Sequence, residues 1–205
     1  MTQTQTYSSL KSAVDILHKD RSSKFYGYAF PVQSVDAIKA HLVELKNLYP
    51  DASHICYAYL LGVDGTTFRA NDDGEPSNTA GQPILREIKS LGLTNVFVAV
   101  VRYFGGKKLG VPGLIEAYGT AARLALDAGE VVTKTIQKTC WLKHLGAKDY
   151  QIYEIANRYG FKILKPPTIP GGYFQIEMPL ESFSSLLTAL QSLPNFELTD
   201  KPNGF

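Results

Sequence analysis

The chain has 205 residues, of which 44% are hydrophobic and 20% charged, and this length and composition fit a globular protein with two domains. No apolar run approaches the ~20 residues of a membrane helix, and the start, MTQTQTYSSLKSAVD, lacks the apolar core of a signal peptide, so we expect a cytoplasmic protein without a membrane partner. The formal net charge of +2 allows an RNA or phosphate partner without requiring one, and the spacing of Cys56 and Cys140 predicts neither a metal site nor a disulfide.

The first half of the chain predicts strands and helices in alternation after a polar N-terminal tail. Residues 24–30, 54–61 and 66–70 are typical of strands, and the nearly continuous β-branched and aromatic run 95–104 predicts a strand covered on both faces. Helices are expected from the cap Ser34 to residue 48, over 79–91, and over 114–128 before Gly129. Thr79 and Gln82 have the spacing of a capping box for the second of these helices.

The second half repeats a strand and helix pattern. Strands are expected over 137–145, 161–168, 173–180 and 195–200, and helices over 148–159 and 180–193. The resulting order, βαββαβ, is the ferredoxin-like arrangement. Because no cluster of chemically reactive side chains falls in this half, we interpret it as a binding or scaffolding module.

The stretch NDDGEPSNTAGQPI places Asp72, Asp73 and Glu75 within four positions ahead of a helix. Carboxylates so close together repel one another unless a cation, backbone amides or a basic partner offsets their charge. A metal site, an acid/base pair, a recognition loop and a solvated turn all fit, and the positive end of the helix accounts for part of the stabilisation. His54 and Cys56 share one face of a strand, where packing is favoured over a nucleophile pair.

A glycine-rich loop, GGKKLGVPG, connects the apolar strand to the next helix. This order is the geometry of an anion cradle, in which glycines admit close backbone approach and the helix adds its positive end. Neither GxGxxG nor a Walker sequence is present, so a tight turn with solvated lysines remains the alternative. The candidate phosphate-binding or nucleic-acid-binding residues are Arg102, Tyr103, Gly105, Gly106, Lys107, Lys108 and Gly110.

Two blocks, DDGEPSNTAGQPIL and VVRYFGGKKLGVPGLIEAYGTAA, closely resemble the signature of the IMPACT family, also called YigZ-like. The likeness extends upstream through SSKFYGYAFPV and DASHICYAY, so that it covers most of residues 1–130. Asn78 stands where the family usually has glycine, and Val111-Pro112 replace the usual Thr-Gly. Both departures reduce backbone freedom at these positions.

The resemblance implies an α+β protein. Residues 1–135 would form an α/β sandwich like the second domain of a small-subunit ribosomal protein, and 136–205 a ferredoxin-like domain similar to the last domain of elongation factor G. Eukaryotic members act in translational control, so the resemblance implies a translation-linked regulatory protein that binds RNA, the ribosome or a protein partner.

We assign no catalytic residue, metal ligand or cofactor. A metal-dependent phosphate-handling enzyme using the three carboxylates is the alternative, and a protein-interaction module whose acidic loop meets a basic partner is a third possibility. Because both blocks end in loops that enter helices, we expect them side by side, with Glu75 or Asp73 within ion-pair distance of Arg102 or Lys107. The residues expected to form the recognition loop are Asp72, Asp73, Glu75, Thr79 and Gly81.

Overall fold

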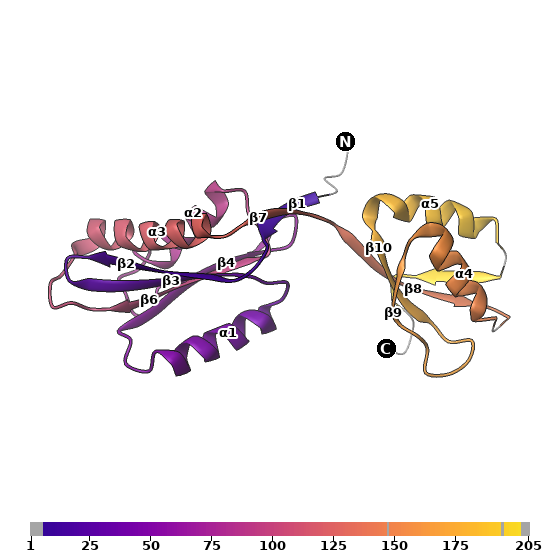
Figure 1. The fold of residues 1–205 in the computed structure, drawn as a ribbon, viewed down its shortest axis with the longest axis horizontal. Coiled ribbons are helices and arrows are strands. Elements are labelled where there is room, and N and C mark those ends of the chain that lie inside the picture. Colours follow the sequence, from indigo (N-terminus) through magenta and orange to yellow (C-terminus); the bar gives the residue numbers. More distant parts are fainter. Residues whose placement is uncertain (1–5, 147, 194, 202–205) are drawn as a thin grey trace. The chain divides into compact units, whose positions relative to one another are not determined.

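A computed structural model describes residues 6–146, 148–193 and 195–201. These residues form two compact units, of which one comprises Tyr7–Lys134 and the other comprises Thr6 and the described residues from Thr135 onward (Figure 1). Each unit combines helices with antiparallel sheet, so the predicted α+β class is confirmed. The helices are α1 (Val35–Leu48), α2 (Gly81–Ser90), α3 (Gly110–Ala128), α4 (Tyr150–Tyr159) and α5 (Leu180–Gln191).

The N-terminal unit is built on an antiparallel sheet with the strand order β2-β3-β6-β4-β5. Helices α2 and α3 cover one face of this sheet, and α1 lies against the other (Figure 1). The first and last strands of the unit, β1 and β7, pair with each other in a separate ladder. The strand bounds are β1 Thr6–Leu10, β2 Val14–Asp20, β3 Ser23–Pro31, β4 His54–Leu61, β5 Thr67–Asn71, β6 Val96–Tyr103 and β7 Val131–Thr135.

Strand β6 lies at the centre of the sheet, as its apolar run predicts. Its even-numbered positions from Val96 to Val100 belong to the core under α2 and α3, whereas Phe97 and Ala99 belong to the core under α1. Both faces of the strand are therefore buried, which explains why its sequence does not alternate between apolar and polar residues.

Three local predictions are wrong. The polar tail expected before residue 24 forms β1 and β2 from Thr6 onward. Neither strand carries an apolar run, because both are partly exposed, so the sequence pattern does not predict them. Helix α3 begins at Gly110 and not at 114, so that Pro112 falls in its first turn, where a missing N–H costs little. The capping box at Thr79 is also absent, and the amides at the start of α2 instead donate to the side chain of Asp72.

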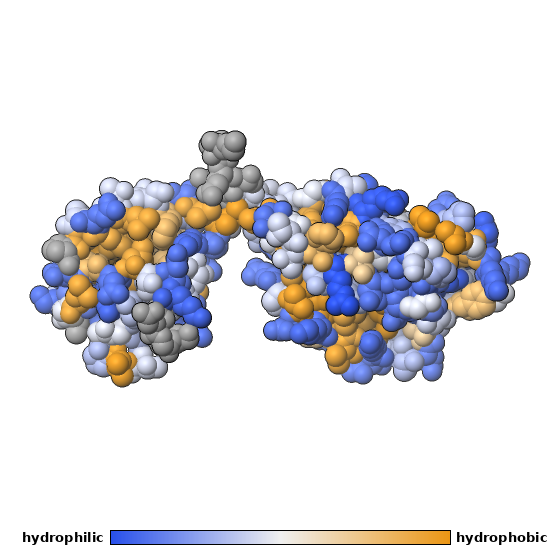
Figure 2. Space-filling view, turned by 180° about the vertical axis from the view of Figure 1, so that it is seen from behind, coloured by the Kyte–Doolittle hydropathy of each residue, from blue (hydrophilic) through white to orange (hydrophobic). Residues whose placement is uncertain are grey.

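The C-terminal unit has the order βαββαβ, with the antiparallel strand order β11-β8-β10-β9. Cys140 of β8 pairs with Ile176 of β10, and both residues face the core that α4 and α5 cover. Hydrophilic residues make up most of the visible surface of each unit, with hydrophobic patches between them (Figure 2). The strands are β8 Gln137–His144, β9 Lys162–Lys165, β10 Phe174–Pro179 and β11 Phe196–Thr199.

Candidate functional site

Asp72, the first acid of the loop between β5 and α2, caps the helix across a long stretch of chain. Its carboxylate accepts hydrogen bonds from the backbone amides of Asn78 (2.9 Å), Ala80 (3.0 Å) and Gly81 (2.8 Å). The last two amides lie at the N-terminus of α2, where unpaired N–H groups carry positive partial charge. The charge of Asp72 is therefore satisfied within the protein.

The predicted capping box fails because Asp72 already occupies the end of the helix. The hydroxyl of Thr79 donates to the carbonyl of Pro76 (2.6 Å), which tightens the loop, and Gln82 is exposed. The N-cap position is Ala80, which has no side chain able to accept a hydrogen bond. Thr79 and Gly81 are thus structural members of the acidic loop, buried beside the cap.

Asp73 is also held by backbone groups. Its carboxylate accepts from the amide of Ile55 (2.7 Å), and its carbonyl accepts from His54 Nδ1 (2.7 Å). The neighbouring Cys56 thiol donates to the carbonyl of Asp72 (3.0 Å), and burial raises the thiol pKa well above its usual value. His54 and Cys56 therefore bond to the loop and not to each other, so they do not form a nucleophile pair.

Glu75 and Arg102 form a buried ion pair that joins the two signature blocks. Arg102 Nη1 lies 2.5 Å from Glu75 Oε1, and the hydroxyl of Tyr118 donates to the same oxygen at 2.8 Å. Burial raises the pKa of the Tyr118 phenol, so it remains a proton donor. The prediction that the blocks lie side by side with an ion pair between them is confirmed.

The glycine loop between β6 and α3 requires glycine at two positions for different reasons. A Cβ atom on Gly105 would lie 2.0 Å from the carbonyl oxygen of Ser22 in the turn between β2 and β3. Gly106 has a φ of 84°, which side chains rarely adopt, but the space around it is open. The turn and the loop are thus in contact, and Lys107 and Lys108 that follow are exposed.

Both signature blocks line one pocket of about 390 Å³ at the N-terminus of α3. Leu109 occupies the N-cap position, so no side chain caps this helix, and the first turn contains no acidic residue. Arg102 Nε is buried and has no hydrogen-bond partner among the described residues. The lining residues are Glu75, Pro76, Arg102, Phe104, Lys108, Leu109, Gly110, Val111 and Leu114.

The structure brings together most of the predicted site residues but separates Tyr103 from them. Tyr103 lies on the face of the sheet that α1 covers in part, where its ring packs against Tyr26 and Tyr49. Two residues of the site are not predicted from the sequence, Tyr118 and Ser23. The hydroxyl of Ser23 accepts a hydrogen bond from Arg102 Nη2 (3.4 Å). Tyr118 occupies a core position of an amphipathic helix, and nothing in the local sequence separates it from an ordinary core aromatic.

The two departures from the family signature fit the backbone. Asn78 adopts a φ of 64°, a left-handed conformation that asparagine tolerates better than most residues. Val111 and Pro112 lie in the first turn of α3, and Val111 is exposed at the rim of the pocket. Pro112 removes one amide from the open helix end.

The described residues contain no group of three or more His, Cys, Asp and Glu side chains placed to hold a metal ion. Within the same residues, no helix is both long enough and apolar enough to cross a membrane.

Known proteins resemble this chain in sequence and in overall fold. Residues 21–126 match the family described as the Impact N-terminal domain. An IMPACT family member of Haemophilus influenzae is 30% identical over 188 residues, which are 89% of this chain and 91% of that protein. IMPACT family member YvyE of Bacillus subtilis is 35% identical over 133 residues, 65% of this chain and 61% of that protein, so the match spans less than two thirds of that relative. The crystal structure of a protein described only as hypothetical superposes with a TM-score of 0.79 and 25% identity, covering 98% of this chain and 99% of the other.

Proposed function

Because this chain belongs to the IMPACT family, we propose that it is a regulatory protein of translation that binds RNA through its phosphate backbone. The binding surface is the open N-terminus of α3 together with the glycine loop before it. The role in translation rests on the family's eukaryotic members, and we place it in the cytoplasm with them.

The observation that carries this proposal is the contrast between two neighbouring helix ends. The N-terminus of α2 is neutralised by Asp72, whereas the N-terminus of α3 has no capping side chain and opens onto the pocket. Uncapped helix N-termini attract phosphate because their amides point outward and the helix dipole favours negative charge. Lys107 and Lys108 stand directly before this end, and both are exposed.

The charges that line the pocket also favour an anion. Glu75 is neutralised by Arg102 and Tyr118, so its carboxylate does not repel a phosphate group at full strength. Lys108 is a lining residue that forms no ion pair among the described residues. The positive charge of Lys108 in the pocket is therefore available to bind an anion.

The acidic loop supports the other hypotheses less well. A basic protein partner or a divalent metal would need carboxylates free to bind it. Asp72, Asp73 and Glu75 instead accept hydrogen bonds from backbone amides, or from Arg102 and Tyr118. Their role in this proposal is to fix the loop against β4 and β6, which keeps the pocket in shape.

The test is fluorescence anisotropy of a labelled single-stranded RNA oligonucleotide titrated with the full chain at several salt concentrations. Phosphate contacts release counterions, so the logarithm of the association constant should fall with the logarithm of salt by about 0.7 per phosphate contacted on a single strand. Charge reversal in Lys107→Glu/Lys108→Glu should weaken binding and reduce this slope by about 1.4, if each lysine contacts one phosphate.

The matched control is Arg86→Glu/Lys89→Glu, which reverses two exposed charges on α2. If the control weakens binding as much as the loop variant, the contact is a general charge effect and the assigned site is wrong. Wild-type protein that leaves the anisotropy unchanged at low salt would refute RNA binding itself.

A further inference from the structure

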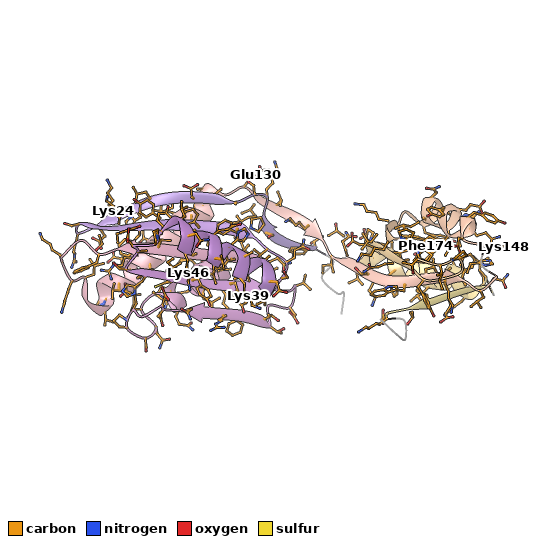
Figure 3. The ribbon with its side chains drawn as sticks, turned by 90° about the horizontal axis from the view of Figure 1, so that it is seen from below. Lys24, Lys39, Lys46, Glu130, Lys148 and Phe174 are labelled. Carbon is orange, nitrogen blue, oxygen red and sulfur yellow. The ribbon has the colours of Figure 1, made fainter. Side chains whose placement is uncertain are left out.

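The face of the N-terminal sheet opposite α2 and α3 is covered along only part of its length. Helix α1 packs over the part that contains Phe97, and it ends at its C-cap, Tyr49. Tyr26 on β3 and Tyr103 on β6 lie beyond this end, on the same face. Figure 3 shows this face, with Lys39 and Lys46 on α1 and Lys24 farther out, past the Lys46 end of the helix.

Three tyrosine rings pack together there, and we call Tyr26, Tyr49 and Tyr103 the tyrosine platform. Their ring centroids are separated by 5.2 Å (Tyr26 and Tyr49), 6.1 Å (Tyr26 and Tyr103) and 6.2 Å (Tyr49 and Tyr103). Each residue is half-buried, so the rings are held by one another and still present surface to solvent. A hollow of about 420 Å³ opens beside them, lined by Ser22, Lys24, Tyr26, Tyr103 and Phe104.

The surroundings of the platform are basic. The end of β2, the β2–β3 turn, the start of β3 and the glycine loop together supply five basic side chains, against acidic side chains at Asp20 and Asp51. None of the five forms an ion pair among the described residues. The basic residues are Lys19, Arg21, Lys24, Lys107 and Lys108.

The hollow and the pocket at the N-terminus of α3 share one lining residue. Phe104 lines both, and it is half-exposed. The amide of Gly105 donates to the hydroxyl of Ser23 (3.3 Å), which fixes the glycine loop against the start of β3. Phe104 thus borders both the surface that carries Lys108 and the surface that carries Tyr26 and Tyr103.

We propose that the tyrosine platform binds unpaired bases of single-stranded RNA by stacking, with Lys24 contacting the backbone beside them. The inference rests on the function proposed above and adds the class of ligand. Aromatic rings on the central strands of a sheet stack on splayed bases, and the rim of basic residues suits the adjoining phosphates. Bases inside a duplex are stacked on each other and cannot reach such a surface.

The first test compares wild-type binding of single-stranded RNA with binding of a duplex of the same length, by anisotropy competition. Single-stranded RNA should bind at least about tenfold more tightly, since stacking on one ring alone accounts for roughly that factor. Equal affinity for both would overturn the platform. The salt slope of the Lys107→Glu/Lys108→Glu variant would still decide the phosphate site.

The second test replaces the rings. Tyr26→Leu/Tyr103→Leu should lower the affinity for single-stranded RNA by about tenfold or more while leaving the salt slope unchanged, because stacking releases no counterions. Tyr26→Phe/Tyr103→Phe keeps the rings and should bind like the wild type. If the leucine variant fails to fold, Lys24→Glu, at an exposed position, provides the decision, since it should reduce both affinity and slope.

The outcomes separate the two proposals. Leucine variants that are folded and bind as tightly as the wild type refute the platform and leave the phosphate site standing. Wild-type protein that binds no oligonucleotide at low salt refutes both proposals.

Discussion

Removal of the Glu75 carboxylate should destabilise the N-terminal unit more than most single substitutions. In Glu75→Ala, the guanidinium of Arg102 keeps its charge in a site where its side chain is 6% exposed, and the Tyr118 hydroxyl loses its acceptor. Breaking a buried pair by removing one partner costs about 3–5 kcal/mol. The cost of the unpaired Tyr118 hydroxyl is included in this range and is not added to it, because Tyr118 and Arg102 both bond to the same Glu75 oxygen.

The measurement is urea unfolding followed by far-ultraviolet circular dichroism. With a slope of about 2 kcal/mol per molar urea, a loss of about 4 kcal/mol lowers the midpoint by about 2 M. The single tryptophan, Trp141, lies in the C-terminal unit, so its fluorescence reports that unit and its midpoint should not change. Glu116→Ala, an exposed carboxylate on α3, is the matched control and should stay within about 0.5 kcal/mol of the wild type.

A cycle with Arg102→Met sharpens the test. If the pair is desolvated, the double variant Glu75→Ala/Arg102→Met should be more stable than Glu75→Ala or Arg102→Met alone, because no buried charge is left without a partner. A loss below about 1 kcal/mol in Glu75→Ala, the value of an exposed pair, would show that water reaches the two groups and that the reasoning is wrong.

Further predictions concern the helix cap, the glycine loop and the two buried thiols. Asp72→Ala should cost about 2 kcal/mol in urea unfolding and Asp72→Asn less, since the amide keeps one acceptor for the helix amides. Gly105→Ala should destabilise by about 1–3 kcal/mol through collision with the β2–β3 turn, more than Gly106→Ala, which strains only its own backbone; similar losses would contradict the close approach. Burial raises the pKa of Cys140 to about 11 and that of Cys56 further, so iodoacetamide at pH 8 should modify both thiols only after unfolding. Because the unfolded thiols ionise first, stability should fall as pH rises from about 8.5 toward 11, and a rise would contradict it.

The elements that the sequence predicts well are those whose pattern is local. The bounds of β4 match because its apolar run has clear ends, and α1 begins after Ser34, whose hydroxyl accepts from the amide of Ala37 (3.2 Å). Strand β2 was missed because it is half-exposed along its length and so resembles a polar tail.

The candidate site shows the same limit. That the two signature blocks meet follows from both being helix-entry loops, and the Glu75–Arg102 pair bears it out. The cap supplied by Asp72 crosses eight residues to Ala80, whereas capping rules consider neighbours three or four apart. Tyr118 joins the site from 43 residues away, and only the packing of α3 on the sheet brings it there.

The central position of β6 has a consequence for how the chain folds as it is synthesised. β6 is the last of the five sheet strands to be made, and it pairs with β3 on one side and β4 on the other. Before it is available, β2 with β3 and β4 with β5 can form only two separate hairpins, each of which is marginal alone. Insertion of β6 closes the sheet and brings Arg102 to Glu75 in the same step. A nascent chain that stalls short of Tyr103 would thus expose the edges of β3 and β4, the kind of unpaired edge that promotes aggregation.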